Sequence, residues 1–329
     1  MDQPKDRFGR GVNYIRVSVT KRCNLRCAYC MPMDGSLVRP RGDMLAIDQI
    51  IRLISLFAPF GVRKVRLTGG EPLLRKGIFG LIRGLKRISG IGEVTMTTNG
   101  VLLEKNIPRL RDAGLDRINI SLDSLKAGRV RAISGHDIHE PVMRAIRRVA
   151  EERIWPVKIN VVAIRGFNDD EILDFTQLAF DLPVEVRFIE MMPTAHNRLF
   201  AGRRGIAAGE IERIVRERHD LRPATSPLTG GPAEVYDIAG GAGRIGFVAP
   251  LSRHFCGSCN RLRLTAEGAL RSCLFNDGEV DLRRGFLEGA PDQWFVDRFK
   301  ESLQVKPKGH GLSAASSAPC EKPMAAIGG

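Results

Sequence analysis

Short runs rich in β-branched residues alternate with amphipathic stretches over the first two thirds of the chain. Six runs are candidate strands, at residues 14–19, 64–68, 93–98, 117–122, 157–163 and 184–190. In the stretches between them apolar residues recur at three- and four-residue spacing, as on the buried face of a helix. The clearest of these stretches are residues 46–57, 79–88 and 170–180. The pattern therefore predicts six βα units in succession.

Strands that alternate with helices are joined by right-handed crossovers, so we expect a parallel sheet. Six units are two short of a full (β/α)8 barrel. We therefore predict an α/β fold, an incomplete (β/α)6 TIM-type barrel with an open side. In such a barrel the active site lies at the C-terminal ends of the strands, where the βα loops gather.

The pattern changes after about residue 195. Residues 225–234, TSPLTGGPAE, are typical of a linker, and a helix is expected around 291–303. The tail from residue 306 is rich in small residues, so its composition predicts disorder. We divide the chain into a barrel, residues 1–195, and a C-terminal region, residues 196–329. Three runs in that region are typical of antiparallel hairpins: 234–238, 244–250 and 261–270.

Composition is that of an ordinary globular protein, with 43% hydrophobic and 27% charged residues among 329. No apolar run approaches the length of a bilayer-spanning helix, and the N-terminus MDQPKDRFGR is too polar for a secretory signal. We expect a cytoplasmic protein. The net charge of +14 indicates either nucleic acid or an anionic small substrate, and the absence of a basic run leaves a nucleic-acid-binding tail unsupported.

Six of the seven cysteines fall into two triplets. In a reducing compartment clustered cysteines indicate metal binding or catalysis rather than disulfides. Cys320 stands alone near the C-terminus, and we interpret it as a free thiol without a role. The triplets are Cys23, Cys27 and Cys30, and Cys256, Cys259 and Cys273.

The first triplet, in KRCNLRCAYC, directly follows the first candidate strand. A zinc site would need a fourth ligand, and neither flank offers a nearby Cys or His. Three unrelated cysteines within eight residues are improbable. A four-iron cluster held by three thiolates fits best, because it leaves one iron open to chelate a small ligand.

This C-x3-C-x2-C motif, with Tyr29 before its last cysteine, resembles the radical S-adenosylmethionine (SAM) enzymes. The resemblance implies that the amino and carboxylate groups of SAM occupy the open iron. LTGGEPLLR, residues 67–75, resembles the segment that holds the SAM amino group, with glycines for close backbone approach and a carboxylate acceptor. The resemblance implies that five positions contact SAM: Tyr29, Gly70, Glu71, Ser121 and Met192.

The second triplet has the spacing C-x2-C-x13-C. Spacing alone slightly favours zinc, with His254 or Cys320 as a fourth ligand. However, FCGSCNRLRLT with a later SCLF and a C-terminal IGG resembles the GTP 3′,8-cyclases, the family of molybdenum cofactor biosynthesis protein A. The match runs from about Asn13 to Gly329. It implies a second [4Fe–4S] cluster, again with an open iron.

The resemblance implies a lyase that converts GTP to (8S)-3′,8-cyclo-7,8-dihydroguanosine 5′-triphosphate through a 5′-deoxyadenosyl radical. It makes Arg16 a catalytic residue as well as a substrate contact, and it implies that Gly328 and Gly329 enter the active site. GTP carries about four negative charges, so cationic side chains are needed around it. The positions that match its contacts are Arg16, Arg66, Thr97, Lys158, Arg261, Leu262 and Arg263.

Two alternatives stay open. A radical SAM peptide-modifying enzyme would need more C-terminal cysteines than this chain has. A zinc-dependent RNA-binding protein would account for the charge and the CxxC motif, but only 6% of the residues are aromatic and three are Tyr. For the cyclase we expect cyclic pyranopterin monophosphate synthase to take the product, and a monomer or homodimer. The electron donor is not indicated by the sequence.

Overall fold

The computed structural model describes residues 4–30, 44–193, 197, 204–224, 231–275, 278–311 and 324–327. Cys320, Gly328, Gly329 and most of the expected linker at 225–234 lie outside the described residues. Of the helices in the described residues, none is long and apolar enough to cross a membrane.

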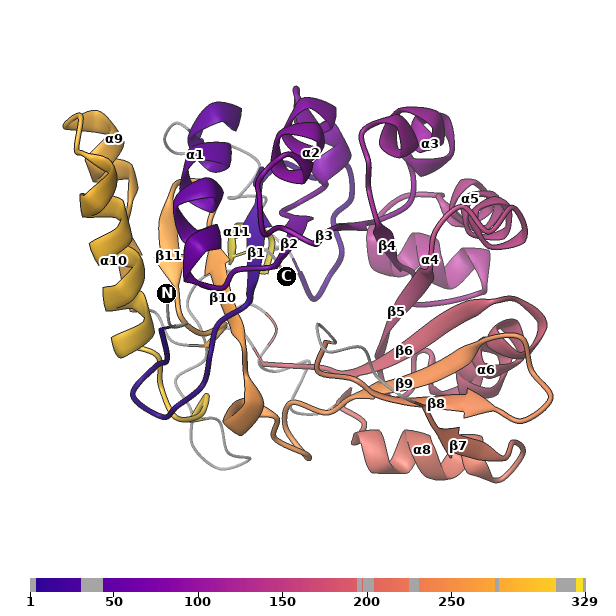
Figure 1. Ribbon diagram of the computed structural model, residues 1–329. Helices are drawn as coiled ribbons and strands as arrows, with labels where there is room; N and C mark the ends of the chain where they lie inside the picture. Colours follow the sequence, from indigo (N-terminus) through magenta and orange to yellow (C-terminus); the bar gives the residue numbers. More distant parts are fainter. Residues whose placement is uncertain are drawn as a thin grey trace.

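Six parallel strands in chain order form the centre of one sheet (Figure 1). Each of the six predicted strands is confirmed, with ends that differ by at most one residue. The fold class is likewise confirmed as an incomplete, open barrel. The strands are β1 (Tyr14–Ser18), β2 (Lys64–Thr68), β3 (Glu93–Thr98), β4 (Arg117–Ser121), β5 (Val157–Ala163) and β6 (Val184–Glu190).

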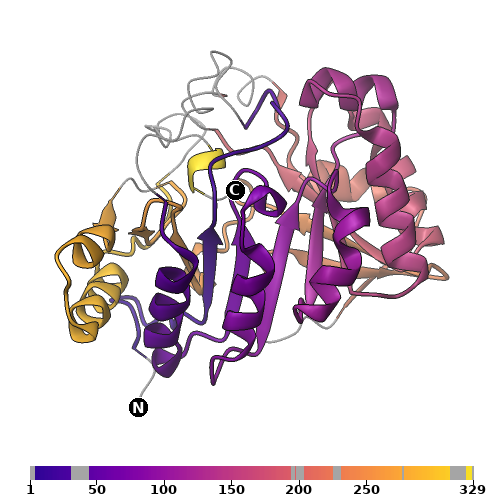
Figure 2. The same cartoon turned by 90° about the horizontal axis from the view of Figure 1, so that it is seen from above.

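Helices between the strands cover the outer face of this sheet (Figures 1 and 2). The first of them buries Ile50, Leu53, Ile54 and Phe57, the spacing of one helical face. The helices are α1 (Ile47–Phe57), α2 (Ile78–Lys86), α3 (Leu103–Asp112), α4 (Ala127–Ser134), α5 (His139–Glu151) and α6 (Ile172–Asp181). Short 3₁₀ helices span Ala58–Phe60, Pro72–Leu74, Asp169–Glu171 and Cys256–Ser258.

The C-terminal region extends the same sheet at both edges. The order is β12-β11-β10-β1-β2-β3-β4-β5-β6-β9-β8-β7, so the described strands form an open sheet. The predicted hairpins β8–β9 and β10–β11 are present and antiparallel. The added strands are β7 (Leu221–Pro223), β8 (Glu234–Ile238), β9 (Arg244–Val248), β10 (Arg261–Leu264), β11 (Ala269–Arg271) and β12 (Glu279–Asp281).

One feature of these hairpins was not predicted. β10 also pairs in parallel with β1, and β9 pairs in parallel with β6. The C-terminal hairpins therefore continue the barrel wall instead of forming a separate sheet. The division at residues 195 and 196 stays a prediction.

Among the described residues after β6 there are four more helices: α8 (Ala208–Arg216), α9 (Arg283–Leu287), α10 (Asp292–Gln304) and α11 (Met324–Ile327). The helix expected around 291–303 is α10. It packs beside α1 (Figure 1), where the rings of Phe57 and Phe299 stack with centroids 4.5 Å apart.

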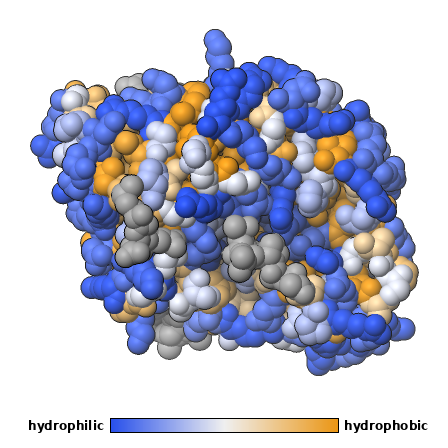
Figure 3. Space-filling view, viewed as in Figure 1, coloured by the Kyte–Doolittle hydropathy of each residue, from blue (hydrophilic) through white to orange (hydrophobic). Residues whose placement is uncertain are grey.

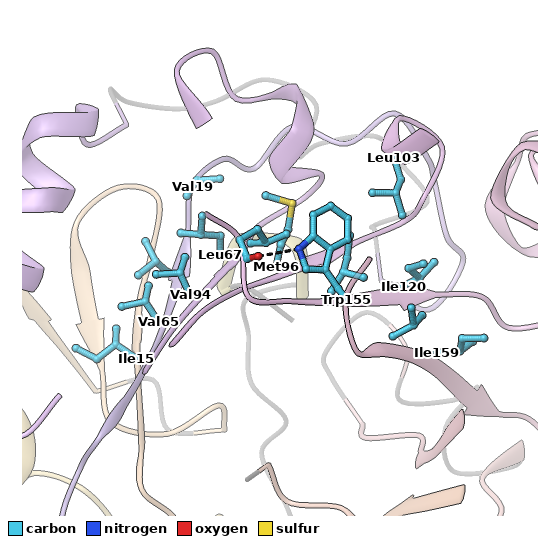
Figure 4. Close-up of a cluster of buried hydrophobic side chains, with 14 of the residues drawn as sticks. Ile15, Val19, Val65, Leu67, Val94, Met96, Leu103, Ile120, Trp155 and Ile159 are labelled. Atoms are coloured by element: carbon cyan, nitrogen blue, oxygen red, sulfur yellow. Dashed lines mark hydrogen bonds between the residues drawn. The ribbon is translucent and has the colours of Figure 1, made fainter. Parts of the chain in front are cut away.

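The apolar core lies between the sheet and the outer helices. Alternate strand residues such as Ile15, Val65 and Met96 are fully buried there (Figure 4). At its edge the indole Nε1 of Trp155 donates to the carbonyl oxygen of Leu115 over 2.7 Å. On the molecular face in Figure 3, hydrophilic side chains predominate and hydrophobic ones form separate patches. The residues that alternate with the core residues face the barrel interior, which is therefore available for polar chemistry.

Candidate active site

A cavity of about 330 Å³ lies inside the open barrel. Inward-facing side chains of the strands line it, and so do all six cysteines of the two triplets. Residues 23–30 and 256–273 therefore face one space, although more than 200 residues separate them in sequence. The volume suits a small-molecule ligand.

The two triplets lie toward opposite ends of the barrel strands. Cys23 follows the C-terminal end of β1, whereas Arg261 at the start of β10 pairs with Tyr14 at the start of β1. Cys259, two residues before Arg261, therefore lies at the N-terminal ends. We expected the active site at the C-terminal ends, where the first triplet lies. The second triplet lies at the other ends, because Cys256 and Cys259 belong to the segment that precedes β10.

The first triplet has the donor chemistry of a metal cluster. Burial raises the pKa of the Cys27 thiol well above its usual range, and the Cys30 thiol and the Asp123 carboxyl add to the rise. Burial also raises the pKa of Cys23. Thiols in such surroundings become thiolates when a cation binds them. The residues present therefore fit the iron–sulfur cluster that the resemblance implies.

Tyr29 anchors the loop of this triplet. Its hydroxyl donates to Oδ2 of Asp123 over 2.7 Å, and its carbonyl oxygen accepts from Nδ2 of Asn197 over 3.1 Å. Asn197 also donates to the carbonyl of Met192 over 3.3 Å. Burial raises the pKa of Asp123 to about 6. Tyr29 and Met192, two predicted SAM contacts, thus line the cavity and share a hydrogen-bond partner.

Gly69 and Gly70 allow the loop after β2 to pack against the cysteine loop. A side chain at Gly69 would collide with the carbonyl oxygen of Thr20, and one at Gly70 with that of Arg22. The amide of Gly70 donates to Thr20 over 2.7 Å, and that of Glu71 to Arg22 over 2.8 Å. Both glycines also line the cavity.

Glu71, the predicted carboxylate acceptor for the SAM amino group, is not among the residues that line the cavity. It is fully buried, and its carboxylate accepts from the Thr98 hydroxyl and the Asn99 amide over 2.8 Å each and from the Leu73 amide over 3.0 Å. Burial raises its pKa to about 7. The carboxylate therefore supports the loop, because it joins the backbone and side-chain donors of Leu73, Thr98 and Asn99.

The second triplet lies beside cationic groups. Burial acts to raise the pKa of Cys259, but the charges of Arg261 and Lys306 outweigh it and hold that pKa at about 6. Burial raises the pKa of Cys256. Within the described part of the chain, no three Cys, His, Asp or Glu side chains converge on the position of a single metal ion. Geometry therefore leaves the choice between zinc and a cluster to the family.

Cationic side chains crowd the cavity. Burial and the neighbouring Arg263 lower the pKa of Arg16 well below its usual range, and burial and Arg261 lower that of Arg263 to about 10. Arg66 donates from Nε to the Thr95 hydroxyl over 3.3 Å. Cations that depress one another's pKa values favour a polyanionic ligand. The lining arginines are Arg16, Arg66, Arg187, Arg261 and Arg263.

Lys158 and Leu262, two of the predicted substrate contacts, do not line the cavity. The Lys158 ammonium forms a salt bridge of 3.2 Å with the Glu185 carboxylate. Burial and Arg187 lower its pKa to about 7. The Leu262 side chain is fully buried in the core, so only its backbone can contact a ligand. Thr97 and Ser121 line the cavity as expected.

The C-terminal helix reaches the cavity. Met324 lines it, and Ile327 is 1% exposed in a cluster with Phe275, Met192 and Leu251. Figures 1 and 2 both place α11 beside the barrel strands near β1. The described part of the tail is therefore ordered, contrary to its composition, because apolar side chains at its end find a buried site.

Several lining residues were missed by the sequence analysis. Asp123 lies two residues after Ser121, and Arg187 lies five residues before Met192, so the predicted SAM contacts nearby were a signal for both. Tyr14, Asn160 and His310 line the cavity with no comparable signal, because only the fold shows which way they face.

Comparisons with known proteins settle the family. Residues 17–179 match the radical SAM superfamily, and residues 184–312 match the family described as Molybdenum Cofactor Synthesis C. The GTP 3′,8-cyclase of Moorella thermoacetica is 42% identical over 325 residues, which cover 99% of this chain and 100% of that protein. The chain belongs to the GTP 3′,8-cyclase family of radical SAM proteins. The GTP 3′,8-cyclase of Syntrophomonas wolfei is 41% identical over 98% of this chain and 99% of its own length.

Solved structures agree on the fold of this radical SAM protein. SuiB of Streptococcus suis, in a crystal structure with bound S-adenosylmethionine, matches with a TM-score of 0.63 at 13% identity, covering 89% of this chain and 68% of SuiB. A structure of SuiB bound to its precursor peptide SuiA matches with a TM-score of 0.62. At this identity the likeness shows the shared fold alone.

Proposed function

We propose that this chain converts GTP to (8S)-3′,8-cyclo-7,8-dihydroguanosine 5′-triphosphate, as a lyase in the first step of molybdenum cofactor biosynthesis. The observation that carries the proposal is the single cavity that both cysteine triplets and five arginines line. A cofactor site at one end and a cationic wall along the interior suit a reaction between SAM and a nucleoside triphosphate. Full-length relatives named GTP 3′,8-cyclase support this choice of substrate.

Cys23, Cys27 and Cys30 would hold the first [4Fe–4S] cluster, with SAM against the backbone of Gly69 and Gly70. When bound, the cluster and SAM supply the 5′-deoxyadenosyl radical that abstracts hydrogen from ribose C3′. The chain's own contribution is to position SAM beside Tyr29, Ser121 and Met192 and to keep water away from the reacting carbon.

Cys256, Cys259 and Cys273 would hold a second [4Fe–4S] cluster, whose open iron would bind the guanine. Arg16, Arg66, Arg261 and Arg263 would then neutralise the triphosphate, because their charges line the same cavity. These residues would orient the nucleotide, with its base toward the second triplet and its ribose toward the first. Family membership disfavours both alternatives, the peptide-modifying enzyme and the zinc-dependent RNA-binding protein.

We further propose a cytoplasmic protein, monomeric or homodimeric, with no nucleic-acid partner. Its product would pass to cyclic pyranopterin monophosphate synthase. The test of the activity is anaerobic incubation with GTP, SAM and dithionite, followed by mass analysis of the nucleotide. The expected product has the mass of GTP and a different retention time. Recovery of unchanged GTP alongside cleaved SAM would refute the proposed substrate.

A further inference from the structure

The ammonium group of Lys306 lies buried behind the second cysteine triplet. Lys306 is 2% exposed, just beyond the end of α10. Its Nζ donates to the carbonyl oxygens of Arg261 and Ser272, over 2.8 Å each, and lies 3.5 Å from Sγ of Cys259. An ammonium has three donors, so these contacts account for all of them. The side chain is therefore committed to the triplet and its neighbours.

The two carbonyl groups belong to the segments that carry two of the cysteines. Arg261 follows Cys259 by two residues, and Ser272 immediately precedes Cys273. One ammonium thus joins the start of β10 to the segment after β11. A buried ammonium also needs a negative partner, and a thiolate at Cys259 supplies one.

Arg10 holds the segment of the remaining cysteine, Cys256, through hydrogen bonds to backbone carbonyl groups. One guanidinium nitrogen donates to the carbonyls of Cys256 and Lys308, over 2.7 and 3.1 Å, and the other donates to that of Pro307 over 2.6 Å. Its Nε pairs with Asp6 over 2.6 Å. Arg10 is 8% exposed, and its rigid fork joins the N-terminal segment to the Cys256 turn and to the chain just after Lys306.

We propose that Lys306 and Arg10 are the positioning residues of the second triplet. They hold its three segments in place before any cluster binds, and Lys306 places a positive charge against the thiolates that makes the bound cluster easier to reduce. The charge effect follows from the dependence of cluster potentials on net charge and on hydrogen bonds to sulfur. This inference rests on the proposed second cluster.

The test uses the full chain with Cys23, Cys27 and Cys30 replaced by Ala, so that every iron signal comes from the second site. Lys306→Met should release iron to a chelator about tenfold faster than this parent, the usual cost of losing an outer-shell partner. Its cluster should also show a more negative midpoint in a titration followed by electron paramagnetic resonance. Lys306→Arg keeps the charge and should restore most of the potential. Lys308→Met removes an exposed charge from the same segment and should match the parent.

Arg10→Lys separates position from charge. A lysine cannot serve three carbonyl groups at once in this geometry, so the cluster should be lost faster while its potential stays near that of the parent. Parent-like iron release and potential in Lys306→Met would overturn the inference. If the parent protein contains zinc and no iron, the proposal of a second cluster is wrong. In that case faster zinc loss from Lys306→Met than from the parent supports the positioning role, and equal zinc loss overturns it.

A separate feature of the cavity is the hydroxyl group of Tyr14. The side chain is 2% exposed and lines the cavity, and its hydroxyl oxygen has no hydrogen-bond partner among the described residues. The Lys64 ammonium and the Arg66 guanidinium carbon lie 5.3 and 5.4 Å from the centre of its ring. In the sheet Tyr14 pairs with Arg261 on its other side. A buried hydroxyl thus faces a group of cations.

We infer that the Tyr14 hydroxyl donates to a phosphate oxygen of GTP, an inference that also rests on the proposed function. The surrounding cations are donors only, so they offer the hydroxyl no acceptor. A phosphate among them would accept from the hydroxyl and neutralise the cations together. Tyr14 would then be a substrate-binding residue beyond those that the resemblance implies.

Tyr14→Phe removes the hydroxyl and keeps the ring against Lys64 and Arg66. The variant should bind GTP about tenfold more weakly, the effect of one hydrogen bond to a charged group, and should bind guanosine as the wild type does. Tyr236→Phe, on β8 outside the cavity lining, is the matched control and should bind both normally. Unchanged GTP affinity, or an equal loss for guanosine, would overturn the phosphate contact. A wild-type protein that binds no GTP would overturn the proposed function instead.

Discussion

The carboxyl group of Glu71 shows how burial changes the behaviour of one residue. Burial raises its pKa to about 7, although three hydrogen bonds act to lower it. In the unfolded chain the pKa of a Glu is about 4.3. Between these values the folded protein binds a proton that the unfolded chain has released. Protonated Glu71 therefore stabilises the fold below the unfolded pKa, and this contribution is lost as the pH rises to about 7.

Glu71→Gln cannot titrate, so its stability should lack this pH dependence. Between pH values of about 4.5 and 7 the free energy of unfolding of the wild type should fall by about 3 kcal/mol relative to the variant. Urea unfolding across this pH range measures the difference. Glu151→Gln, at an exposed position on α5, should follow the wild type. Parallel curves for the wild type and Glu71→Gln would show that the folded pKa is not raised.

Individual site residues could be predicted where a sequence motif specifies both the residue type and its position at the cavity. The six cysteines, Thr97, Ser121 and Met192 all line the cavity as expected. The burial of Glu71 could not be predicted, because the motif gives its position in the loop but not the donors of Thr98 and Asn99, which belong to the next strand and loop. Tyr14 was missed because its importance depends on Lys64 and Arg66 from a neighbouring strand.

At the scale of elements, local pattern was enough for strands and helices but not for their pairing. The six barrel strands were predicted because each is a short apolar run flanked by turn signals, and the helix α10 because its apolar spacing is regular. The parallel pairing of β10 with β1 was missed, because nothing local to residues 261–264 specifies a partner almost 250 residues away.

The four-residue helix α11 is the element that composition most clearly failed to predict. Its position explains how a tail rich in small residues can be ordered, since Ile327 fills a buried site beside Phe275 and Met192. Met192 is also a predicted SAM contact. If the proposed SAM contact holds, docking of the tail and binding of SAM would share the Met192 side chain.

Ile327→Ala should loosen the docked tail. Truncating a buried Ile costs about 2–4 kcal/mol, so cyclised product should fall by about 30-fold or more, while iron content and SAM cleavage stay near wild type. Deletion of Gly328 and Gly329 should abolish the product and spare the same two readouts. Liquid chromatography with mass detection follows nucleotide and 5′-deoxyadenosine together. Wild-type product formation by both variants would mean that the tail has no part in the reaction.

At the scale of the whole molecule, the open barrel separates two cysteine triplets by the length of its strands. A five-residue strand spans about 16 Å, and the cavity between the triplets is lined by cations. This arrangement leaves room for SAM at one end and a nucleotide reaching to the other. It could not be predicted from the motifs, because the position of the second triplet depends on how β10 joins the sheet.

The separation of the triplets predicts separable activities. With one proposed cluster at each triplet, Cys256→Ala should keep about four of about eight irons. It should still cleave SAM under strong reductant, since Cys23, Cys27 and Cys30 remain, but it should make no cyclised nucleotide because GTP loses its iron contact. Cys27→Ala should also keep about four irons, yet it should lose both activities, because no open iron is left to bind SAM.

Metal analysis with parallel assays of 5′-deoxyadenosine and nucleotide checks each expectation. Normal cyclisation by Cys256→Ala would place GTP elsewhere, and about four irons with one zinc in the wild type would make the second triplet a zinc site whose part in the reaction is to shape the cavity.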